Sequence, residues 1–228
     1  DEFASNLGIE MVGSLQSLGH LEPVLRWPAY GGISDTPSVL LTTEAGSYDL
    51  IGKMLDFYSR AFRSRRIHLG MDEAHDLGRG RYLDLNGYRN GFAIFNDHLS
   101  RVMDMCAGYG FEPMIWSDMY FRMGSRSMDY YDPESSIPPE VERAIPRGVQ
   151  LVYWDYYHEE ESFYAEWLRR HYELGSKPVM ASGLWTWRTL WYDHEKTRAT
   201  VEPCLSACRK QGVDEIIFTL WGDDGGFC

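Results

Sequence analysis

Short apolar runs alternate with longer amphipathic stretches along the whole chain. Six of these runs are too short for a helix and several are rich in Val or Ile, so we predict that they are strands. The predicted strands are Gly8–Val12, Arg66–Gly70, Pro113–Trp116, Val149–Trp154, Pro178–Ser182 and Glu215–Leu220.

Four stretches between the runs have apolar residues at helical spacing. The predicted helices are Glu44–Phe62, Tyr88–Ala107, Glu159–Leu174 and Glu195–Gln211. Glycines follow the last three of them, where a helix commonly ends. The segment Phe121–Pro146 has no clear period and predicts a long loop with a short helix near Glu140–Ala144. Long loops on such scaffolds usually serve function.

Alternating strands and helices are typical of an α/β fold with a parallel sheet. No repeat and no linker composition divides the chain, so we predict one domain over residues 1–228. Six strands cannot close an eight-stranded barrel, which leaves an open sheet or a fragment. We favour a fragment of a TIM (β/α)8 barrel that covers strands three to eight, a partial (β/α)8 catalytic domain.

Composition narrows the possible partners. The 228 residues are 44% hydrophobic and 25% charged, as in ordinary globular proteins, and the formal charge of −12 disfavours nucleic acid. Eight Trp and fifteen Tyr among many carboxylates suit a neutral carbohydrate, because apolar sugar faces stack on aromatic rings.

The four cysteines show neither a CxxC motif nor zinc-finger spacing, so we expect reduced thiols and no metal site. Cys204 and Cys208 stand four residues apart on a predicted helix, where each would act as a small apolar side chain. No apolar run is long enough to span a membrane, and the first residues do not form a signal peptide. If the full-length protein has no signal peptide, reduced cysteines favour a cytoplasmic location.

A Trp or a carboxylate follows nearly every predicted strand. In a TIM barrel the carboxyl ends of the strands form the active site. A single Trp at the end of a strand would more often belong to the hydrophobic core. Because Trp and carboxylate residues recur at the carboxyl ends of several strands, which lie on one edge of the sheet, we predict a sugar pocket there. In chain order these residues include His20; Asp72, Glu73 and His75; Trp116 and Asp118; Trp154, Asp155 and Tyr156; Trp185 and Trp187; and Trp221, Asp223 and Asp224.

The neighbours Asp72 and Glu73 should point to opposite sides of an extended strand, unless the chain bends where the strand ends. Double displacement needs two carboxyls about 5–5.5 Å apart, normally from different strands. Adjacent carboxylates fit another scheme better, in which one acid protonates the leaving group and its neighbour supports a nucleophile within the substrate. The neighbouring charge would raise the pKa of the acid. The alternative is a solvated Asp-Glu turn.

The segment His68-Leu-Gly-Met-Asp72-Glu73-Ala74 resembles the catalytic motif of glycoside hydrolase family 20, the β-N-acetylhexosaminidases. Leu18-Gly19-His20 is similar to the Gly-His element of that family. Its Trp-x-Glu and Trp elements resemble Trp116-x-Asp118, Trp154 and Trp221-x-Asp223.

This resemblance implies retaining, substrate-assisted hydrolysis of terminal β-linked GlcNAc or GalNAc from small glycans or glycoconjugates, without cofactor or metal. Glu73 would be the general acid and base, and Asp72 would orient the 2-acetamido group and stabilise an oxazolinium ion. His20 would hold a catalytic carboxylate or the water network. The walls of the sugar site would be Trp116, Trp154, Trp185 and Trp221, and Asp223 would accept from distal hydroxyls.

The chain also departs from the family pattern. Asp223 stands where Glu is frequent, and the segment from Ser182 to Trp187 lacks the usual acetamide-binding Tyr. Tyr156 or Tyr192 would replace that Tyr, and we favour Tyr156. The first two barrel strands, with an Arg that grips sugar hydroxyls, are absent from the sequence.

Three alternatives remain. A double-displacement glycosidase would use Glu73 as acid and base and Asp118 or Asp223 as nucleophile. A sugar-binding module without catalysis would keep the Trp residues, although loss of the carboxylate pair would then be expected. A metal-dependent hydrolase would use His68, His75 and Asp72, which we disfavour because His68 falls within a strand.

Overall fold

The computed structural model describes residues 1–175 and 177–222. The chain divides into two compact units, Asp1–Val149 and Gln150–Cys228.

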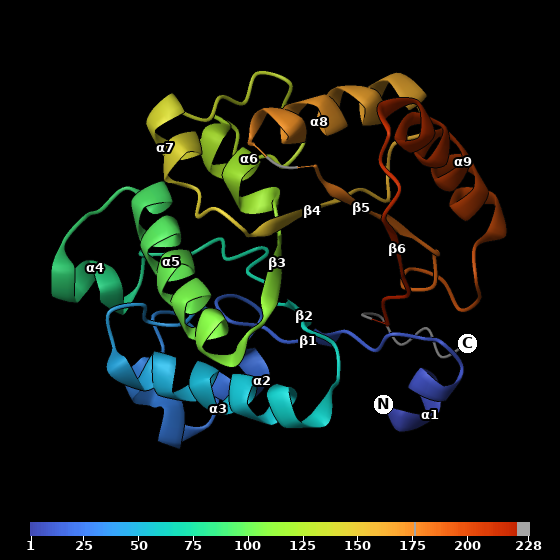
Figure 1. Cartoon of the computed structure of the whole chain (residues 1–228). Helices are drawn as coiled ribbons and strands as arrows, with labels where there is room; N and C mark the ends of the chain where they lie inside the picture. The colour runs from blue at the N-terminus through green and yellow to red at the C-terminus, as the bar shows by residue number, and fades with distance from the viewer. Residues whose placement is uncertain (176, 223–228) are drawn as a thin grey trace. The chain divides into compact units, whose positions relative to one another are not determined.

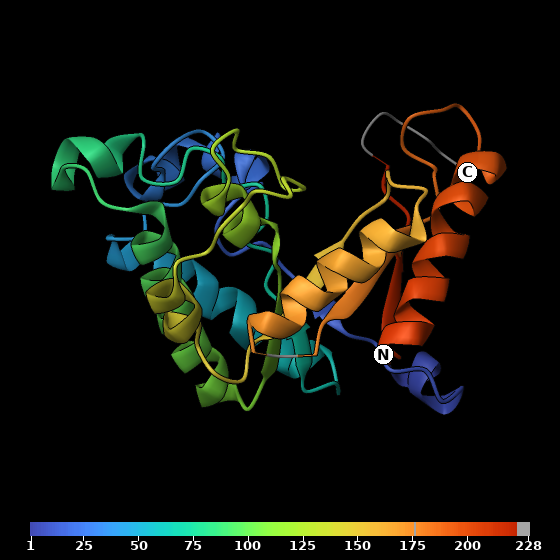
Figure 2. The same ribbon diagram turned by 90° about the horizontal axis from the view of Figure 1, so that it is seen from above.

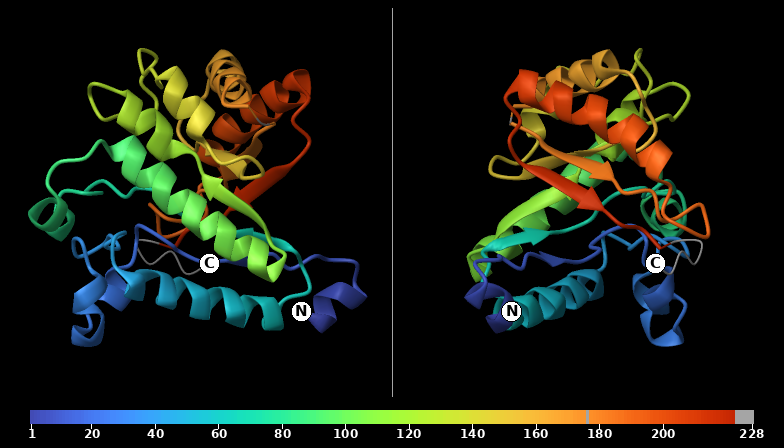
Figure 3. Two further views of the ribbon diagram at one scale, coloured as in Figure 1. Left: turned by 60° about the vertical axis from the view of Figure 1, so that its left-hand side comes forward. Right: turned by 90° about the vertical axis from the view of Figure 1, so that its right-hand side faces the viewer.

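The first unit is built on three parallel strands, β1 (Gly13–Ser14), β2 (Arg66–His68) and β3 (Glu112–Trp116). The helices α3 (Ala45–Ala61) and α5 (Gly91–Tyr109) pack against each other beside these strands (Figures 1 and 3). Apolar residues at helical spacing line their inner faces, including Ile51 and Leu55 on α3. This packing leaves the carboxyl ends of the strands for the loops that carry the candidate chemistry.

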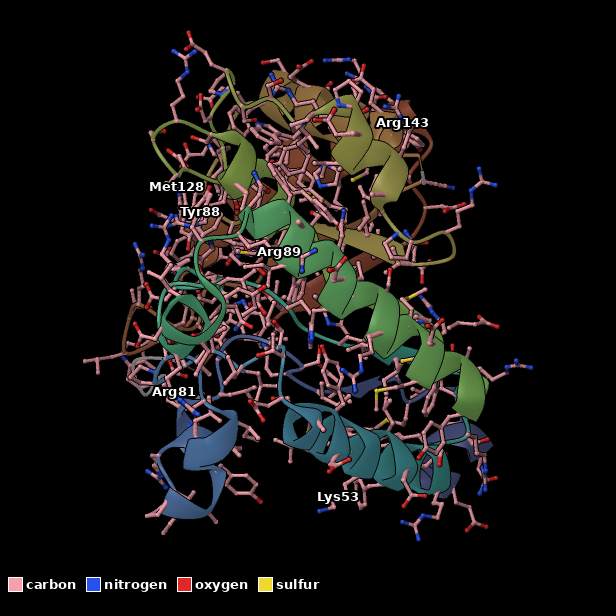
Figure 4. The ribbon with its side chains drawn as sticks, turned by 90° about the vertical axis from the view of Figure 1, so that its left-hand side faces the viewer. Lys53, Arg81, Tyr88, Arg89, Met128 and Arg143 are labelled. Carbon is pink, nitrogen blue, oxygen red and sulfur yellow. The ribbon has the colours of Figure 1, made fainter. Side chains whose placement is uncertain are left out.

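Six shorter helices complete this unit. They are α1 (Glu2–Asn6), α2 (Glu22–Leu25), the 3-10 helix η1 (Pro28–Ile33), α4 (Arg81–Asn86), α6 (Asp118–Gly124) and α7 (Pro139–Ala144). At the start of α4, the Arg81 guanidinium donates to the carbonyls of Gly31 and Gly32, at 2.8 and 3.1 Å (Figure 4). The loop after β2 is thereby joined to the loop after β1.

The second unit also has three parallel strands, β4 (Gln150–Trp154), β5 (Val179–Gly183) and β6 (Ile216–Thr219). Two helices cover them side by side, α8 (Glu161–Glu173) and α9 (His194–Gln211) (Figure 2). Trp167 and Leu168 of α8 and Cys204 and Cys208 of α9 are buried in this layer. Both cysteines are free thiols, as predicted.

The predicted α/β class with parallel strands is confirmed within each unit, and the four long helices form near their expected positions. The helix predicted from Tyr88 begins only at Gly91, because the Asn90 side chain accepts from the Phe92 N–H and caps it. It ends after Tyr109, where Gly110 adopts a left-handed conformation.

Two predicted boundaries were wrong. The first strand is Gly13–Ser14 and not Gly8–Val12; Gly8 has a φ of 73°, and residues 8–12 are exposed. The loop predicted from Phe121 is helical as far as Gly124, because α6 begins at Asp118. Within the described part of the chain, no helix combines the length and the apolar character that crossing a membrane requires.

Candidate active site

The loops after β1 and β2 bring three predicted residues together. The His20 Nε2 atom lies 3.3 Å from an oxygen of Asp72 and 3.3 Å from an oxygen of Glu73. We call Asp72, Glu73 and His20 the carboxylate site. The two acids thus face one imidazole, although neighbours in a strand would point apart.

A sharp turn of the backbone explains this convergence. After β2 ends at His68, φ is 66° at Gly70, 73° at Met71 and 47° at Glu73. Non-glycine residues rarely adopt a positive φ, and such conformations concentrate at functional sites. The bend expected at the strand end is therefore present, and it turns both carboxylates to the same side.

Close approach of two backbones positions His20. A Cβ atom added at Gly19 would lie 2.5 Å from the carbonyl oxygen of Asp72, so only glycine permits this approach. The next residue, His20, has a φ of 53°. The Gly-His pair therefore carries the imidazole directly over the acidic dipeptide.

Gln16 holds Asp72. Its amide Nε2 donates to the Asp72 Oδ1 at 2.9 Å, and its Oε1 accepts from the Met71 N–H at 3.3 Å. One Asp72 oxygen is thereby bound to Gln16, and the other faces His20. The side chain of Asp72 is only 16% exposed, so its orientation is well restrained.

Glu73 is held through both its backbone and its carboxyl group. The backbone N–H donates to the Asp118 Oδ2 at 3.0 Å, from the start of α6. The Tyr130 hydroxyl donates to the Glu73 Oε1 at 3.2 Å. Asp118, predicted to bind substrate, thus accepts a hydrogen bond from the backbone of Glu73.

The electrostatics of the site are dominated by His20. Hydrogen bonds to Asp72 and then Glu73 raise its pKa to about 10, so the imidazole is cationic at neutral pH. The same contact with His20 lowers the pKa of Glu73 below its usual value. The predicted increase from the neighbouring Asp72 charge is present as a smaller effect. The predicted direction was therefore wrong, because the sequence does not show that a cation lies between the two acids.

Trp116, at the end of β3, packs on His68 with ring centroids 4.3 Å apart. The His68 Nδ1 atom accepts from the Gly70 N–H at 3.0 Å, and burial lowers the pKa of His68 to about 4. The ring is therefore neutral and shapes the turn that precedes Asp72. Among the described residues, no group of three His, Cys, Asp or Glu is arranged to hold a metal ion.

In the second unit, four rings form an aromatic cluster at the carboxyl ends of β4 and β5: Trp154, Tyr156, Trp185 and Trp187. Trp154 stacks on Tyr156 at 5.5 Å, and Trp185 stacks on Trp187 at 4.6 Å. The Trp185 Nε1–H donates to the Tyr156 carbonyl at 2.9 Å. The residues predicted from β4 and β5 thus contact one another directly.

Gly183 makes room for this cluster. A Cβ atom at this position would lie 2.6 Å from the Trp187 ring and 2.8 Å from the Tyr156 ring. The carbonyl of Trp221, which follows β6, accepts from the Thr186 hydroxyl at 2.9 Å. Asp223, the predicted acceptor of distal hydroxyls, lies outside the described residues.

Two residues of the site, Gln16 and Tyr130, were not predicted from the sequence. Gln16 lies three residues before Gly19, but an amide gives no chemical signal on its own. Tyr130 comes from the predicted long loop, far from any strand end. Only the expectation that such loops serve function pointed toward it.

Comparison with known proteins identifies the fold. No protein-family model and no curated protein sequence matches the chain. Solved structures do match, among them the tandem family 20 catalytic modules of the pneumococcal exo-β-D-N-acetylglucosaminidase, with a TM-score of 0.57 at 16% identity over 98% of this chain.

Two further matches are of the same kind. The Bacteroides fragilis β-N-acetylhexosaminidase has a TM-score of 0.52 at 18% identity over 87% of this chain. The family 20 exo-β-N-acetylglucosaminidase of Vibrio harveyi, solved with N-acetylglucosamine, has a TM-score of 0.53 at 14% identity over 83%. The chain spans 56%, 38% and 28% of these three structures, in the order given. It therefore has a fold like that of the family 20 catalytic domain, over part of that domain's length.

Proposed function

We propose that the protein is a glycoside hydrolase that removes terminal β-linked GlcNAc or GalNAc from the non-reducing ends of small glycans. The observation that carries this proposal is the convergence of the Asp72 and Glu73 carboxylates on His20 at the carboxyl ends of parallel strands. Solved structures with a similar fold include the Bacteroides fragilis β-N-acetylhexosaminidase and the Vibrio harveyi exo-β-N-acetylglucosaminidase, the latter in complex with N-acetylglucosamine.

The proposed reaction has two steps. The first step uses the protonated form of Glu73, which the contact with His20 disfavours. In this form Glu73 gives its proton to the glycosidic oxygen while the acetamide oxygen of the substrate attacks the anomeric carbon, so the aglycone leaves as an alcohol. Asp72 accepts a hydrogen bond from the acetamide N–H and stabilises the positive oxazolinium ion. In the second step, ionised Glu73 takes a proton from water, and the water oxygen attacks the anomeric carbon. This attack opens the oxazolinium ring and restores the acetamide, so the anomeric configuration is retained overall.

The geometry of Asp72 supports this mechanism. An ion-stabilising carboxylate must be ordered before the charge develops, and the hydrogen bond from Gln16 fixes one of its oxygens. Asp118 suits the double-displacement alternative less well, because its Oδ2 already accepts the Glu73 N–H and the residue is buried. The roles of Trp116, Tyr156, the remaining Trp residues and Asp223 as sugar contacts stay predictions from the sequence.

The test is turnover of p-nitrophenyl β-GlcNAc and β-GalNAc by the full-length protein. We expect Glu73→Gln and Asp72→Asn each to lower kcat by roughly 10²-fold or more, as losses of acid–base and electrostatic catalysis do. Glu140→Gln is the matched control, because this glutamate is exposed on α7.

A GlcNAc-thiazoline separates the mechanisms. It mimics the cyclic intermediate, so it should inhibit a substrate-assisted enzyme and leave a double-displacement enzyme active. Turnover that both variants retain would refute the assignment of the two carboxylates. Binding of GlcNAc without any turnover would instead favour the sugar-binding alternative.

A further inference from the structure

Tyr130 belongs to a closed ring of contacts around Glu73. Its hydroxyl donates to the Glu73 Oε1 at 3.2 Å and also contacts the His75 Nε2. The backbone N–H of His75 donates to the Glu73 carbonyl at 2.7 Å. Glu73 is therefore linked to the Tyr130–His75 pair at its carboxyl group and again at its backbone.

The direction of these hydrogen bonds follows from the chemistry of the groups. An ionised carboxylate only accepts, so the Tyr130 proton lies toward Glu73. The phenol oxygen must then accept from His75, which requires the tautomer with its proton on Nε2. Burial raises the pKa of Tyr130 far above its usual value, so the phenol stays a donor at every working pH.

The loop from Ser125 to Pro138 is folded so as to present Tyr130. The buried Ser125 hydroxyl donates to the Asp132 Oδ2 at 2.7 Å and accepts from the N–H groups of Ser127 and Asp129, at 3.1 and 3.2 Å. The Arg122 guanidinium contacts the Met128 carbonyl and lies 5.4 Å from the Tyr130 ring centroid. Figure 4 labels Met128, two residues before Tyr130 on this loop.

We propose that Tyr130, supported by His75, is a positioning residue for Glu73, an inference that rests on the proposed function. It binds Oε1, so the oxygen that exchanges the proton with substrate and water is Oε2, which lies 3.3 Å from the His20 Nε2 atom. Since the hydroxyl donates, it favours the ionised form of Glu73, which the second step requires as its base.

Several titratable or charged groups surround Glu73, and a pH profile reports all of them together. Those facing it or its partners are His20 from the loop after β1, Asp72 and His75 from its own loop, Asp118 and Arg122 from α6, and Tyr130. Replacement of Tyr130 by Phe changes one neutral donor and none of these charges. A shift caused by this variant is therefore attributable to the lost hydrogen bond.

The first test measures kcat, KM and the pH dependence of kcat/KM for Tyr130→Phe in the full-length protein. Loss of a hydrogen bond to a charged group should lower kcat by about 10-fold, with KM changed less than about threefold. The limb of the profile that reports Glu73 should move up by about one pH unit. Tyr88→Phe is the control, because Tyr88 is 85% exposed (Figure 4).

Two variants of His75 test the support of Tyr130. His75→Leu removes the donor and should lower kcat by a few fold, while His75→Gln keeps an N–H at a similar distance and should restore it. If Tyr130→Phe and Tyr88→Phe have the same kcat and the same position of the Glu73 limb in the pH profile, the positioning role is refuted.

A measurement without turnover separates this inference from the proposed function. Titration of ¹³C-carboxyl glutamate by NMR gives the pKa of Glu73, assigned through the signal missing in Glu73→Gln. A higher pKa in Tyr130→Phe together with an inert wild type would retain the hydrogen-bond role and reject the hydrolase. An unchanged pKa would overturn the inference whatever the activity.

Discussion

Gly70 stands where the chain leaves β2 and turns toward Asp72, and the space that its missing side chain leaves is taken by Gln16. A Cβ atom there would lie 1.9 Å from the Gln16 Oε1, and φ is 66°. The same amide binds Asp72. A single glycine therefore controls both the turn and the residue that orients the ion-stabilising carboxylate.

Replacement of Gly70 by Ala should displace Gln16 and lower kcat by roughly 10-fold or more, since one bond to a charged group is lost. The positive φ should also destabilise the fold by about 1–2 kcal/mol. Gly212→Ala separates the two effects, because Gly212 has a left-handed conformation with a φ of 73° and no atom within 4 Å of an added Cβ. Equal activities of the two variants, measured beside urea unfolding, would contradict the role given to Gln16.

At the scale of elements, the loop between the carboxylate site and α5 is fixed by one buried side chain. The Asp35 carboxylate accepts from the N–H of Gly78 at 3.0 Å and from the N–H of Tyr82 at 2.7 Å. Its own carbonyl accepts from the Arg81 N–H. Asp35 thus joins the loop after β1 to the start of α4.

Asp35→Ala should leave two buried N–H groups without this acceptor and lower the free energy of unfolding by about 3 kcal/mol. Asp49→Ala, on the exposed face of α3, should change it by less than about 0.5 kcal/mol. Urea unfolding measures both. Equal stability of the two variants would show that water or another group replaces the Asp35 contacts.

The sequence predicted those helices and strands that are determined by neighbouring residues, such as capping side chains and glycines. α9 begins where the Asp193 side chain accepts from the Lys196 N–H, and it ends at the left-handed Gly212. The position of β1 was missed, because Gly13 pairs with Ile67 more than fifty residues away, and that register depends on contacts between distant segments. α6 was missed because its four buried residues follow one another without a period of their own.

In the candidate site, too, the residues with a local sequence signal were predicted and those that depend on distant contacts were not. The Asp72-Glu73 pair and His20 were visible as strand-end residues of the right type, and the bend that unites them was expected. The partners Gln16 and Tyr130 were not, because their roles depend on tertiary contacts 56 and 57 residues apart in the sequence. The direction of the Glu73 pKa shift depended on such a contact as well.

At the scale of the whole molecule, the carboxylate site links stability to pH in a chain with a formal charge of −12. The raised pKa of His20 means that its contribution to stability is complete below its unfolded value of 6.5 and declines as pH rises toward about 10. The lowered pKa of Glu73 means that its contribution is present above 4.5 and is lost as pH falls. The contributions of His20 and Glu73 are therefore both complete only between pH 4.5 and pH 6.5.

We therefore expect the difference in unfolding free energy between wild type and His20→Gln to be largest near pH 5–6.5 and to shrink toward both pH 3 and pH 10. Urea unfolding at a series of pH values measures this difference. His194→Gln is the control, because His194 is exposed on α9 and its ring contacts Tyr192. A difference that grows above pH 7 would mean that neutral His20, and not the imidazolium, is the form that the folded protein prefers. The two acids would then repel each other without a cation between them, and the pKa of Glu73 would rise as the adjacent charges alone predict.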